Sequence, residues 1–176
     1  SLNKTLTGKK QALSEGISTA EGKLVIITDA DCIHPSNWLE TIFNYYSEYT
    51  PKMIIAPVAM NGKTVFEKMQ ALEFLSLAGS TAGAAGLQMP VMCNGANLAF
   101  EKAVFEELNN GLQMNEVSGD DVFLLHSIKK KYPKGIHYLK STNAIVTTYA
   151  EKNLKSFFRQ RIRWASKAGS YKDTAT

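Results

Sequence analysis

The segment Lys23-Leu-Val-Ile-Ile-Thr-Asp-Ala-Asp31 decides the fold, because an uninterrupted apolar run ends abruptly in two carboxylates. Continuous apolar runs are typical of strands that are buried on both faces, as in parallel sheets. Ligands of such sheets bind beyond the carboxyl ends of the strands, which is where Asp29 and Asp31 fall. Two carboxylates one residue apart suit a hard divalent cation that also takes diphosphate oxygens. A solvated acidic turn would use the same residues, so the pair alone does not decide the chemistry.

Strands and helices alternate on both sides of this segment. The apolar periodicity predicts further strands at residues 52–58, 96–100, 135–139 and 144–148. It predicts helices at 9–19, 36–46, 64–77, 103–108, 120–131 and 154–167. We expect Ser36 to cap the second helix, and we expect the third to face the core with Phe66, Met69, Leu72 and Leu75. The alternation predicts one domain over residues 1–176, an α/β sandwich with a mostly parallel central sheet.

The composition is that of an ordinary globular protein. The 176 residues are 44% hydrophobic and 20% charged, which excludes disorder, collagen and coiled coil for the whole chain. Two cysteines, Cys32 and Cys93, provide neither a disulfide framework nor a zinc pattern, and we interpret both as small buried residues. The stretch from Phe74 to Phe100 carries no charged residue, but its glycines, asparagines and proline argue against a membrane-spanning helix.

The net charge of +4 is concentrated at one end of the chain. Residues 1–150 hold 13 Lys+Arg and 14 Asp+Glu, whereas residues 151–176 hold 7 and 2. A uniformly basic nucleic-acid-binding domain is therefore excluded, and we expect no nucleic-acid partner. A basic terminal helix that meets phosphates or an anionic membrane surface fits this distribution.

A second acidic pair, Asp120 and Asp121, begins a predicted helix directly after Ser118-Gly119. Adjacent carboxylates raise one another's pKa, and one that faces a site could take a proton from an attacking hydroxyl. The alternative is that Asp120 only caps the helix, and the two roles are compatible because the pair offers one cap and one base.

Two further clusters suit the recognition of a phosphorylated sugar. Gln160, Arg163 and Trp164 are spaced to share one face of the basic helix, where a guanidinium could bind a diphosphate and the indole could stack on a sugar or base. The loop Cys93-Asn-Gly-Ala-Asn97 contains Gly95, which lets the backbone approach a ligand closely, and two amides that could bond sugar hydroxyls. A solvated basic helix and an ordinary turn are the structural alternatives.

The order of these motifs resembles that of the family 2 glycosyltransferases of the GT-A fold. The similarity extends from about Gly8 to Lys167 and includes the run Gly8-Lys9-Lys-Gln-Ala-Leu13 before the first strand. The motif Gln160-x-x-Arg163-Trp164 is common in membrane-associated members such as cellulose, chitin and hyaluronan synthases. The resemblance therefore implies a GT-A-like, Rossmann-like fold, a role in cell-envelope polysaccharide synthesis and a place at the cytoplasmic face of the cell membrane.

The resemblance also assigns roles to the motifs. It implies that Asp29 and Asp31 hold Mg²⁺ or Mn²⁺ and the diphosphate of a UDP- or GDP-sugar. It implies that Asp121 is the catalytic base and that Asp120, in the position often held by Glu, belongs to the same catalytic motif. The implied donor- and acceptor-binding residues are Gln160, Arg163, Trp164, Gly95, Asn97 and Lys9. The implied reaction is inverting transfer of a hexosyl group to a hydroxyl of a glycan or a lipid.

The family's usual first strand, which contributes much of the base and ribose recognition, has no counterpart before Ser1. We therefore expect residues 1–176 to be an N-terminally truncated, soluble part of a catalytic domain. We expect it to be inactive alone and able to self-associate through an exposed sheet edge. The alternatives are a nucleotidyltransferase of related fold, and a non-catalytic module that binds an anionic membrane or RNA through residues 151–176.

Overall fold

The computed structural model describes residues 9–111 and 121–168 of the chain. The strands are β1 (Leu24–Ile27), β2 (Met53–Ile55), β3 (Val58–Asn61), β4 (Leu98–Glu101), β5 (Ile136–Tyr138) and β6 (Val146–Tyr149). The α-helices are α1 (Lys9–Thr19), α2 (Trp38–Tyr49), α3 (Val65–Gly86), α4 (Lys102–Gly111), α5 (Asp121–Lys131) and α6 (Leu154–Ala168), and Thr142–Ala144 forms a short 3₁₀ turn. The predicted α/β class is confirmed.

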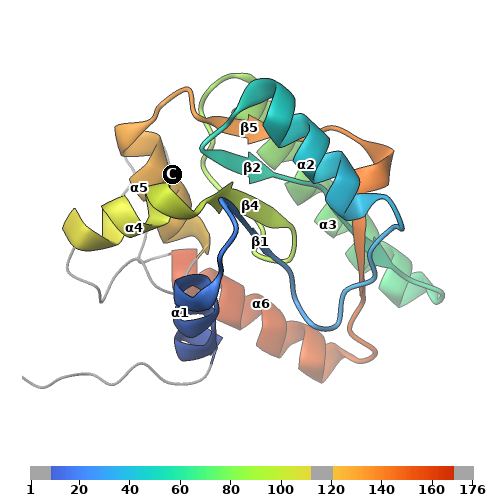
Figure 1. Ribbon diagram of the computed structural model, residues 1–176. Helices are drawn as coiled ribbons and strands as arrows, with labels where there is room; N and C mark the ends of the chain where they lie inside the picture. The colour runs from blue at the N-terminus through green and yellow to red at the C-terminus, as the bar shows by residue number, and fades with distance from the viewer. Residues whose placement is uncertain (1–8, 112–120, 169–176) are drawn as a thin grey trace, which may run out of the picture.

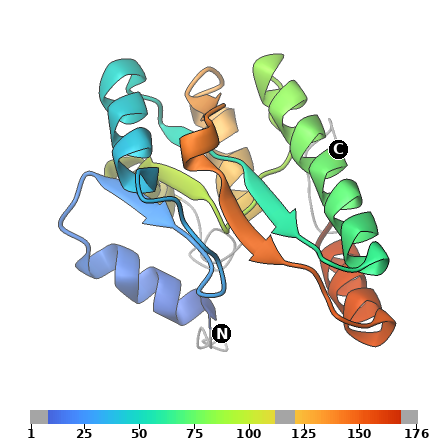
Figure 2. The ribbon, with the colours of Figure 1, turned by 90° about the vertical axis from the view of Figure 1, so that its right-hand side faces the viewer.

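The strands form two sheets. The larger has the order β1-β4-β2-β5, in which β2 and β5 are parallel and β4 runs antiparallel to β1 and to β2. Three of its four strands therefore point in one direction, and β4 is the reversed one, which the strand pattern did not reveal. The smaller sheet pairs β3 with β6 in parallel, and Figure 2 shows these two strands side by side as they lead toward α3 and α6.

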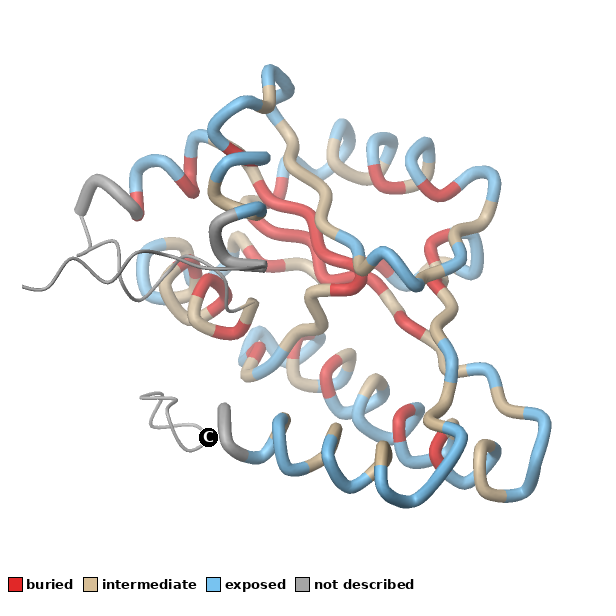
Figure 3. Tube along the Cα trace, turned by 90° about the horizontal axis from the view of Figure 1, so that it is seen from below, coloured by how far each residue is buried: buried red, intermediate tan, exposed pale blue. Residues whose placement is uncertain are grey.

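Alternate residues of the larger sheet face two different helical layers. Phe100 lies between Val25 and Met53 in the register, and this row packs against α1, α4 and α5. The next row, which contains Ala99 and Ile54, faces the opposite way and packs against α2. Figure 1 shows the sheet between these layers, and Figure 3 shows that burial is concentrated in the strands. The larger sheet is thus packed on both faces by helices, and this fixes the ends of the strands from which the loops begin.

Strand β1 is less buried than its apolar sequence predicts. All four of its residues are half-buried, because β1 is the edge strand of the sheet as described and pairs only with β4 there. The expectation of a strand buried on both faces was therefore too strong for this segment. Both faces do contact apolar side chains, Val25 and Ile27 on one side and Leu24 and Ile26 on the other.

Helix α3 differs most from the sequence-based prediction. It begins as expected at a capping box formed by Thr64 and Glu67, but it continues to Gly86, well into the charge-free stretch. Its buried side chains are Gln70, Phe74, Thr81 and Ala85, whereas Met69, Leu72 and Leu75 are exposed and Phe66 is half-buried. The prediction placed the apolar stripe on the wrong side, because the sheet and α6 contact the face that carries Gln70 and Phe74.

Two local predictions also need correction. Residue Asn37, not Ser36, occupies the N-cap position of α2, and its side chain makes no capping hydrogen bond. The strand predicted at residues 52–58 is interrupted at Ala56-Pro57, because proline lacks the N–H that a ladder needs, and the chain there passes from the larger sheet to the smaller one. None of the helices in the described part of the chain is long and apolar enough to span a bilayer.

Candidate active site

The loop after β1 carries Asp29 and Asp31, and three interactions fix its path. Ile33 and Thr147 of β6 exchange two backbone hydrogen bonds of 2.8 and 2.9 Å. The hydroxyl of Thr28 lies 2.7 Å from Nε2 of His34, which joins the two ends of the loop. The carboxylates are therefore held on a short loop that is attached to the second sheet.

The thiol of Cys32 lies next to this acidic pair, and its pKa depends on the charge of the two carboxylates. Burial and the negative charges of Asp31 and Asp29 raise the pKa of Cys32 above its usual value. A thiol with a raised pKa stays protonated at neutral pH and is a poor nucleophile. Cys32 and Cys93 are both half-buried, so the prediction of buried residues was too strong, although each packs against one of the apolar cores.

The loop before β4 places one of its two asparagines at the site and the other in the core. Oδ1 of Asn94 accepts a hydrogen bond of 3.0 Å from the amide of Ala96. Asn97 is completely buried: its Nδ2 donates to the carbonyls of Pro57 and Ala144, each over 2.7 Å, and its Oδ1 accepts from Nε1 of Trp38 over 3.0 Å. Its side chain is thus fully engaged in structural bonds, and the expected contact with a sugar is not supported.

Asp121 begins α5 and points toward the same loop. Its Oδ2 accepts a hydrogen bond of 2.5 Å from the backbone amide of Gly95, and its Oδ1 accepts one of 3.1 Å from the amide of Val122. A Cβ atom at position 95 would lie 3.0 Å from Oδ2, so only glycine lets the backbone come this close to the carboxylate without displacement. We predicted that Gly95 lets the backbone approach a ligand closely. In the structure, the group that its backbone approaches is the side chain of Asp121.

The polar residues of the basic helix α6 do not all face the same way, contrary to what the spacing of Gln160, Arg163 and Trp164 had predicted. Trp164 packs on Phe74 of α3 with ring centroids 6.2 Å apart, and Arg163 is exposed on the neighbouring face. Gln160 is half-buried and bonds within the chain, donating from Nε2 to Oε1 of Glu151 over 3.3 Å. Arg161, to which the sequence analysis gave no role, forms an ion pair with Glu73.

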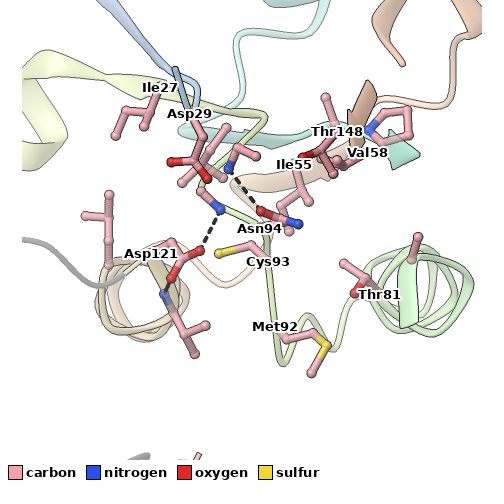
Figure 4. Close-up of a pocket in the computed structure, with 18 of the residues that line it drawn as sticks. Ile27, Asp29, Ile55, Val58, Thr81, Met92, Cys93, Asn94, Asp121 and Thr148 are labelled. Atoms are coloured by element: carbon pink, nitrogen blue, oxygen red, sulfur yellow. Dashed lines mark hydrogen bonds between the residues drawn. The ribbon is translucent and has the colours of Figure 1, made fainter. Parts of the chain in front are cut away.

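A cavity of about 410 Å³ brings the motifs together. Residues from four separate segments line it: Asp29, Asp31, Asn94, Gly95, Asp121, Arg163 and Trp164. Figure 4 shows Asp29, Asn94 and Asp121 directed toward the same space. Gln160 and Asn97 are not among the lining residues, and the side chain of Lys9 and the whole of Asp120 lie outside the described residues.

The rest of the cavity wall was not foreseen. It includes Phe74, Leu77 and Thr81 of α3, Thr148 of β6, and Met92 and Cys93 of the loop. No short motif marks these positions, because their proximity depends on how far α3 extends and which side it buries. The apolar run of α3 was visible in the sequence, but its orientation was not.

Among the described residues, the carboxylates that line the cavity are Asp29 and Asp31 of the loop after β1 and Asp121 at the start of α5, and this limits how the cavity could hold a metal. Among residues 9–111 and 121–168 there is no group of three or more His, Cys, Asp or Glu side chains that could hold a metal ion by themselves. Asp29 and Asp31 nevertheless offer the hard oxygen ligands that Mg²⁺ and Mn²⁺ prefer. Mg²⁺ is often bound by one or two carboxylates together with substrate phosphates. The residues present therefore fit a cation that arrives with a diphosphate.

A family model described as "Glycosyltransferase like family 2" matches residues 1–167. The comparison with curated proteins gives no match.

Among solved structures, glucosyl-3-phosphoglycerate synthase from Mycobacterium tuberculosis with phosphoglyceric acid is similar at 14% identity and a TM-score of 0.49. That match covers 97% of this chain and 58% of that chain. The same enzyme with Mn²⁺ and UDP-glucose matches at 12% identity and a TM-score of 0.48, over 97% and 57% of the two chains. This chain thus spans less than two thirds of the length of these similar structures.

Proposed function

This chain belongs to family 2 of the glycosyltransferases, and from that premise we propose that its cavity is the active site of an inverting glycosyltransferase. The enzyme would move a sugar from a UDP- or GDP-sugar to a hydroxyl of a glycan or a lipid. One observation carries the proposal: Asp29, Asp31, Asp121 and Arg163, from three distant segments of the chain, line a single cavity.

The donor diphosphate would lie between the acidic loop and α6. Asp29 and Asp31 would hold Mg²⁺ or Mn²⁺, which when bound neutralises negative charge on the diphosphate and favours its departure. Arg163 offers a planar guanidinium from the opposite wall, suited to phosphate oxygens. Trp164 presents an apolar ring beside it, on which the acceptor can stack.

Asp121 is the residue we assign as general base. Two backbone amides bond its carboxylate and orient it at the cavity wall, where an ionised carboxylate can take a proton from a hydroxyl. The acceptor hydroxyl would give its proton to Asp121 while its oxygen attacks the anomeric carbon. The bond from that carbon to the diphosphate oxygen breaks, and the electron pair leaves with the diphosphate. One displacement inverts the anomeric configuration, and no covalent enzyme intermediate is needed.

A membrane-facing surface would accompany this activity. Leu154, Phe158 and Ile162 form one stripe of α6, and they are 60%, 57% and 67% exposed. Lys155 lies beside the stripe on the same helix. A basic and apolar helix face of this kind suits an anionic lipid surface, so we assign this surface to the cytoplasmic face of a membrane.

Helix α3 extends the same surface. Its residues Val65, Met69 and Leu72 are exposed, and Met69 lies one turn before Glu73. On α6, Phe158 lies one turn before Arg161, the partner of Glu73. The ion pair therefore joins the two helices beside both apolar stripes. We keep the contact with the membrane as a proposal that is separate from the chemistry in the cavity.

Because we expect residues 1–176 to be inactive alone, the function is tested on the full-length natural protein that contains them, which is incubated with labelled UDP- and GDP-sugars, Mg²⁺ or Mn²⁺, and glycan or lipid acceptors. We expect a glycosylated product whose anomeric configuration, read by NMR, is opposite to that of the donor. We expect Arg163→Gln to abolish transfer, and Arg159→Gln, on the same helix but outside the cavity, to leave it unchanged. Retention of configuration would overturn the inverting mechanism. Release of pyrophosphate from a nucleoside triphosphate, without sugar transfer, would favour the nucleotidyltransferase alternative.

A further inference from the structure

We propose that Gln70 and Glu73 of α3 are positioning residues that hold Arg163 and Trp164 of α6 at the cavity wall. Neither lines the cavity, and both act through residues of α6 and of the turn before it. The inference rests on the proposed function, because it concerns the wall that would bind the donor diphosphate and the acceptor.

Gln70 fixes the place where α6 begins. Its side chain is only 2% exposed, and it bonds the backbone of Glu151 in both directions. Nε2 donates to the carbonyl of Glu151 over 2.9 Å, and Oε1 accepts from the amide of Glu151 over 3.0 Å. A buried amide with this reciprocal pairing is costly to disturb, since each lost bond leaves a buried polar group unpaired. Glu151 lies between β6 and α6, so Gln70 sets the entry point of the helix.

Glu73 sets the rotation of α6 about its axis. Its two carboxylate oxygens accept from Nε of Arg161 over 3.0 and 3.2 Å, and Oε2 also accepts from Nη2 over 2.6 Å. A fork of this kind defines an orientation as well as a distance. The side chain of Arg161 is only 17% exposed, although the helix lies at the surface. The pair therefore acts as a defined contact between the helices rather than as a loose surface ion pair.

Arg161 also contacts Trp164, so the position of Arg161 affects the position of the indole ring. Its guanidinium carbon lies 4.3 Å from the ring centroid of Trp164 and 4.5 Å from that of Phe157. A guanidinium over an aromatic face is an attractive contact with a preferred geometry. The carboxylate of Glu73 thus holds Arg161, and Arg161 covers one face of the indole whose remaining surface borders the cavity.

Gln160 completes the arrangement. Its Oε1 accepts from Nη1 of Arg161, and its Nε2 bonds the carboxylate of Glu151. We name the set Gln70, Glu73, Glu151, Gln160 and Arg161 the α3–α6 clasp. Within the motif Gln160-x-x-Arg163-Trp164, the glutamine therefore belongs to the clasp, and the arginine and tryptophan line the cavity. Arg163 follows Arg161 by two residues on the same helix, so a rotation of α6 that released the clasp would move Arg163 and Trp164 relative to the cavity wall.

The test compares two clasp variants, Glu73→Gln and Arg161→Gln, with the control Arg159→Gln. Like Arg161→Gln, the control removes one positive charge from α6, but at a position outside the clasp. In the full-length protein we expect the two clasp variants to lose about 10- to 100-fold in kcat/KM, because a small misplacement of a binding group costs this much. We expect their unfolding midpoints to shift by less than about 4 °C, since a partly exposed ion pair contributes little stability. Arg159→Gln should retain the wild-type kcat/KM.

Two further readouts separate positioning from a general structural role. The exchanged pair Glu73→Arg with Arg161→Glu should recover most of the lost kcat/KM. Trp164 fluorescence, taken as the difference from Trp164→Phe, should shift to longer wavelength in Glu73→Gln and stay unchanged in Arg159→Gln. Wild-type kinetics and emission in both clasp variants would overturn the inference. Absence of transfer by the full-length wild-type protein would instead overturn the proposed function, and the emission of Trp164 in residues 1–176 would still test the clasp.

Discussion

The backbone amide of Gly95 donates a 2.5 Å hydrogen bond to Oδ2 of Asp121, which joins the loop before β4 to the first residue of α5 at the cavity wall. The bond holds one carboxylate oxygen of Asp121 against the backbone of the loop before β4, and the carboxylate still lines the cavity. A residue assigned as a proton acceptor thus has its position set by the backbone of a loop that also lines the binding space.

We predict that Gly95→Ala lowers kcat/KM by about 10- to 100-fold, because the new Cβ would lie 3.0 Å from Oδ2 and would displace the carboxylate. Steady-state transfer assays check this. The matched control is Gly79→Ala in α3, where an added Cβ meets no atom within 4 Å. That change should leave activity intact and stabilise the helix by up to about 1 kcal/mol. Equal activity of Gly95→Ala and wild type would contradict the proposed role of this contact.

Asp121→Asn should lower kcat by about 10²- to 10⁴-fold, the usual contribution of a general base. The amide oxygen of asparagine can still accept from Gly95, so the fold and donor binding should be retained. Isothermal titration with the nucleoside diphosphate measures binding, and product formation measures turnover. Full turnover by this variant would refute the assignment of Asp121 as base, whatever the result for binding.

The pKa of Cys32 provides a test of the metal site that does not depend on activity. Its pKa is raised by burial and by the charges of Asp31 and Asp29, so little thiolate forms at pH 8. A divalent cation on the two carboxylates should lower that pKa and speed alkylation of Cys32 at pH 8, measured by mass spectrometry in a Cys93→Ser background. Asp31→Asn should speed alkylation without metal and reduce the response to Mg²⁺. An unchanged alkylation rate at millimolar Mg²⁺ and Mn²⁺ would argue against a cation at this pair.

Asn97 should matter for stability rather than for ligand binding. Asn97→Ala leaves the Trp38 N–H and the carbonyls of Pro57 and Ala144 without their buried partner. We expect the free energy of unfolding to fall by about 2–4 kcal/mol, measured by denaturant titration. Asn94→Ala, which removes a single acceptor at the half-exposed cavity wall, should cost less than half as much. A stable Asn97→Ala protein with weakened donor binding would restore the original expectation of a ligand contact.

The exposed stripe of α6 should bind anionic vesicles. We expect Phe158→Asp with Ile162→Asp to weaken co-sedimentation with phosphatidylserine vesicles at least about 10-fold, since each side chain contributes apolar area. Phe43→Asp, at an equally exposed position of α2, is the matched control and should have no effect. Vesicle binding should also fall with salt. A concentration-dependent dimer without vesicle binding would instead assign the stripe, or the edge strand β1, to self-association.

The sequence indicated the motifs because each depends on neighbouring residues. The apolar run before Asp29, the acidic pair that includes Asp121 and the spacing of Arg163 and Trp164 are all local patterns. The structure brings Asp29, Asp121, Arg163 and Trp164 to one cavity. The antiparallel direction of β4 could not be read, since strand periodicity is the same in both directions.

The failures came from contacts between distant parts of the chain. Glu73 and Arg161 are 88 residues apart, and nothing near either one marks the other as its partner. Met69 and Leu72 have the spacing of a core-facing stripe, yet the buried face of α3 is the one with Gln70, whose amide gains two bonds to Glu151. Asn97 has the sequence context of a binding loop, and its three structural partners are distant in sequence.

The two backbone hydrogen bonds between Ile33 and Thr147 tie the loop that carries Asp29 and Asp31 to β6, the strand that precedes α6. The loop cannot open without breaking this bridge, and β6 cannot slide without carrying Asp31 with it. The bridge thereby limits the span between Arg163 of α6 and the carboxylates of Asp29 and Asp31, which we propose bind the cation. Donors would be selected by whether their diphosphate fits that span. Lengthening the β6–α6 turn should therefore change which donor is accepted before it changes how fast the accepted donor reacts.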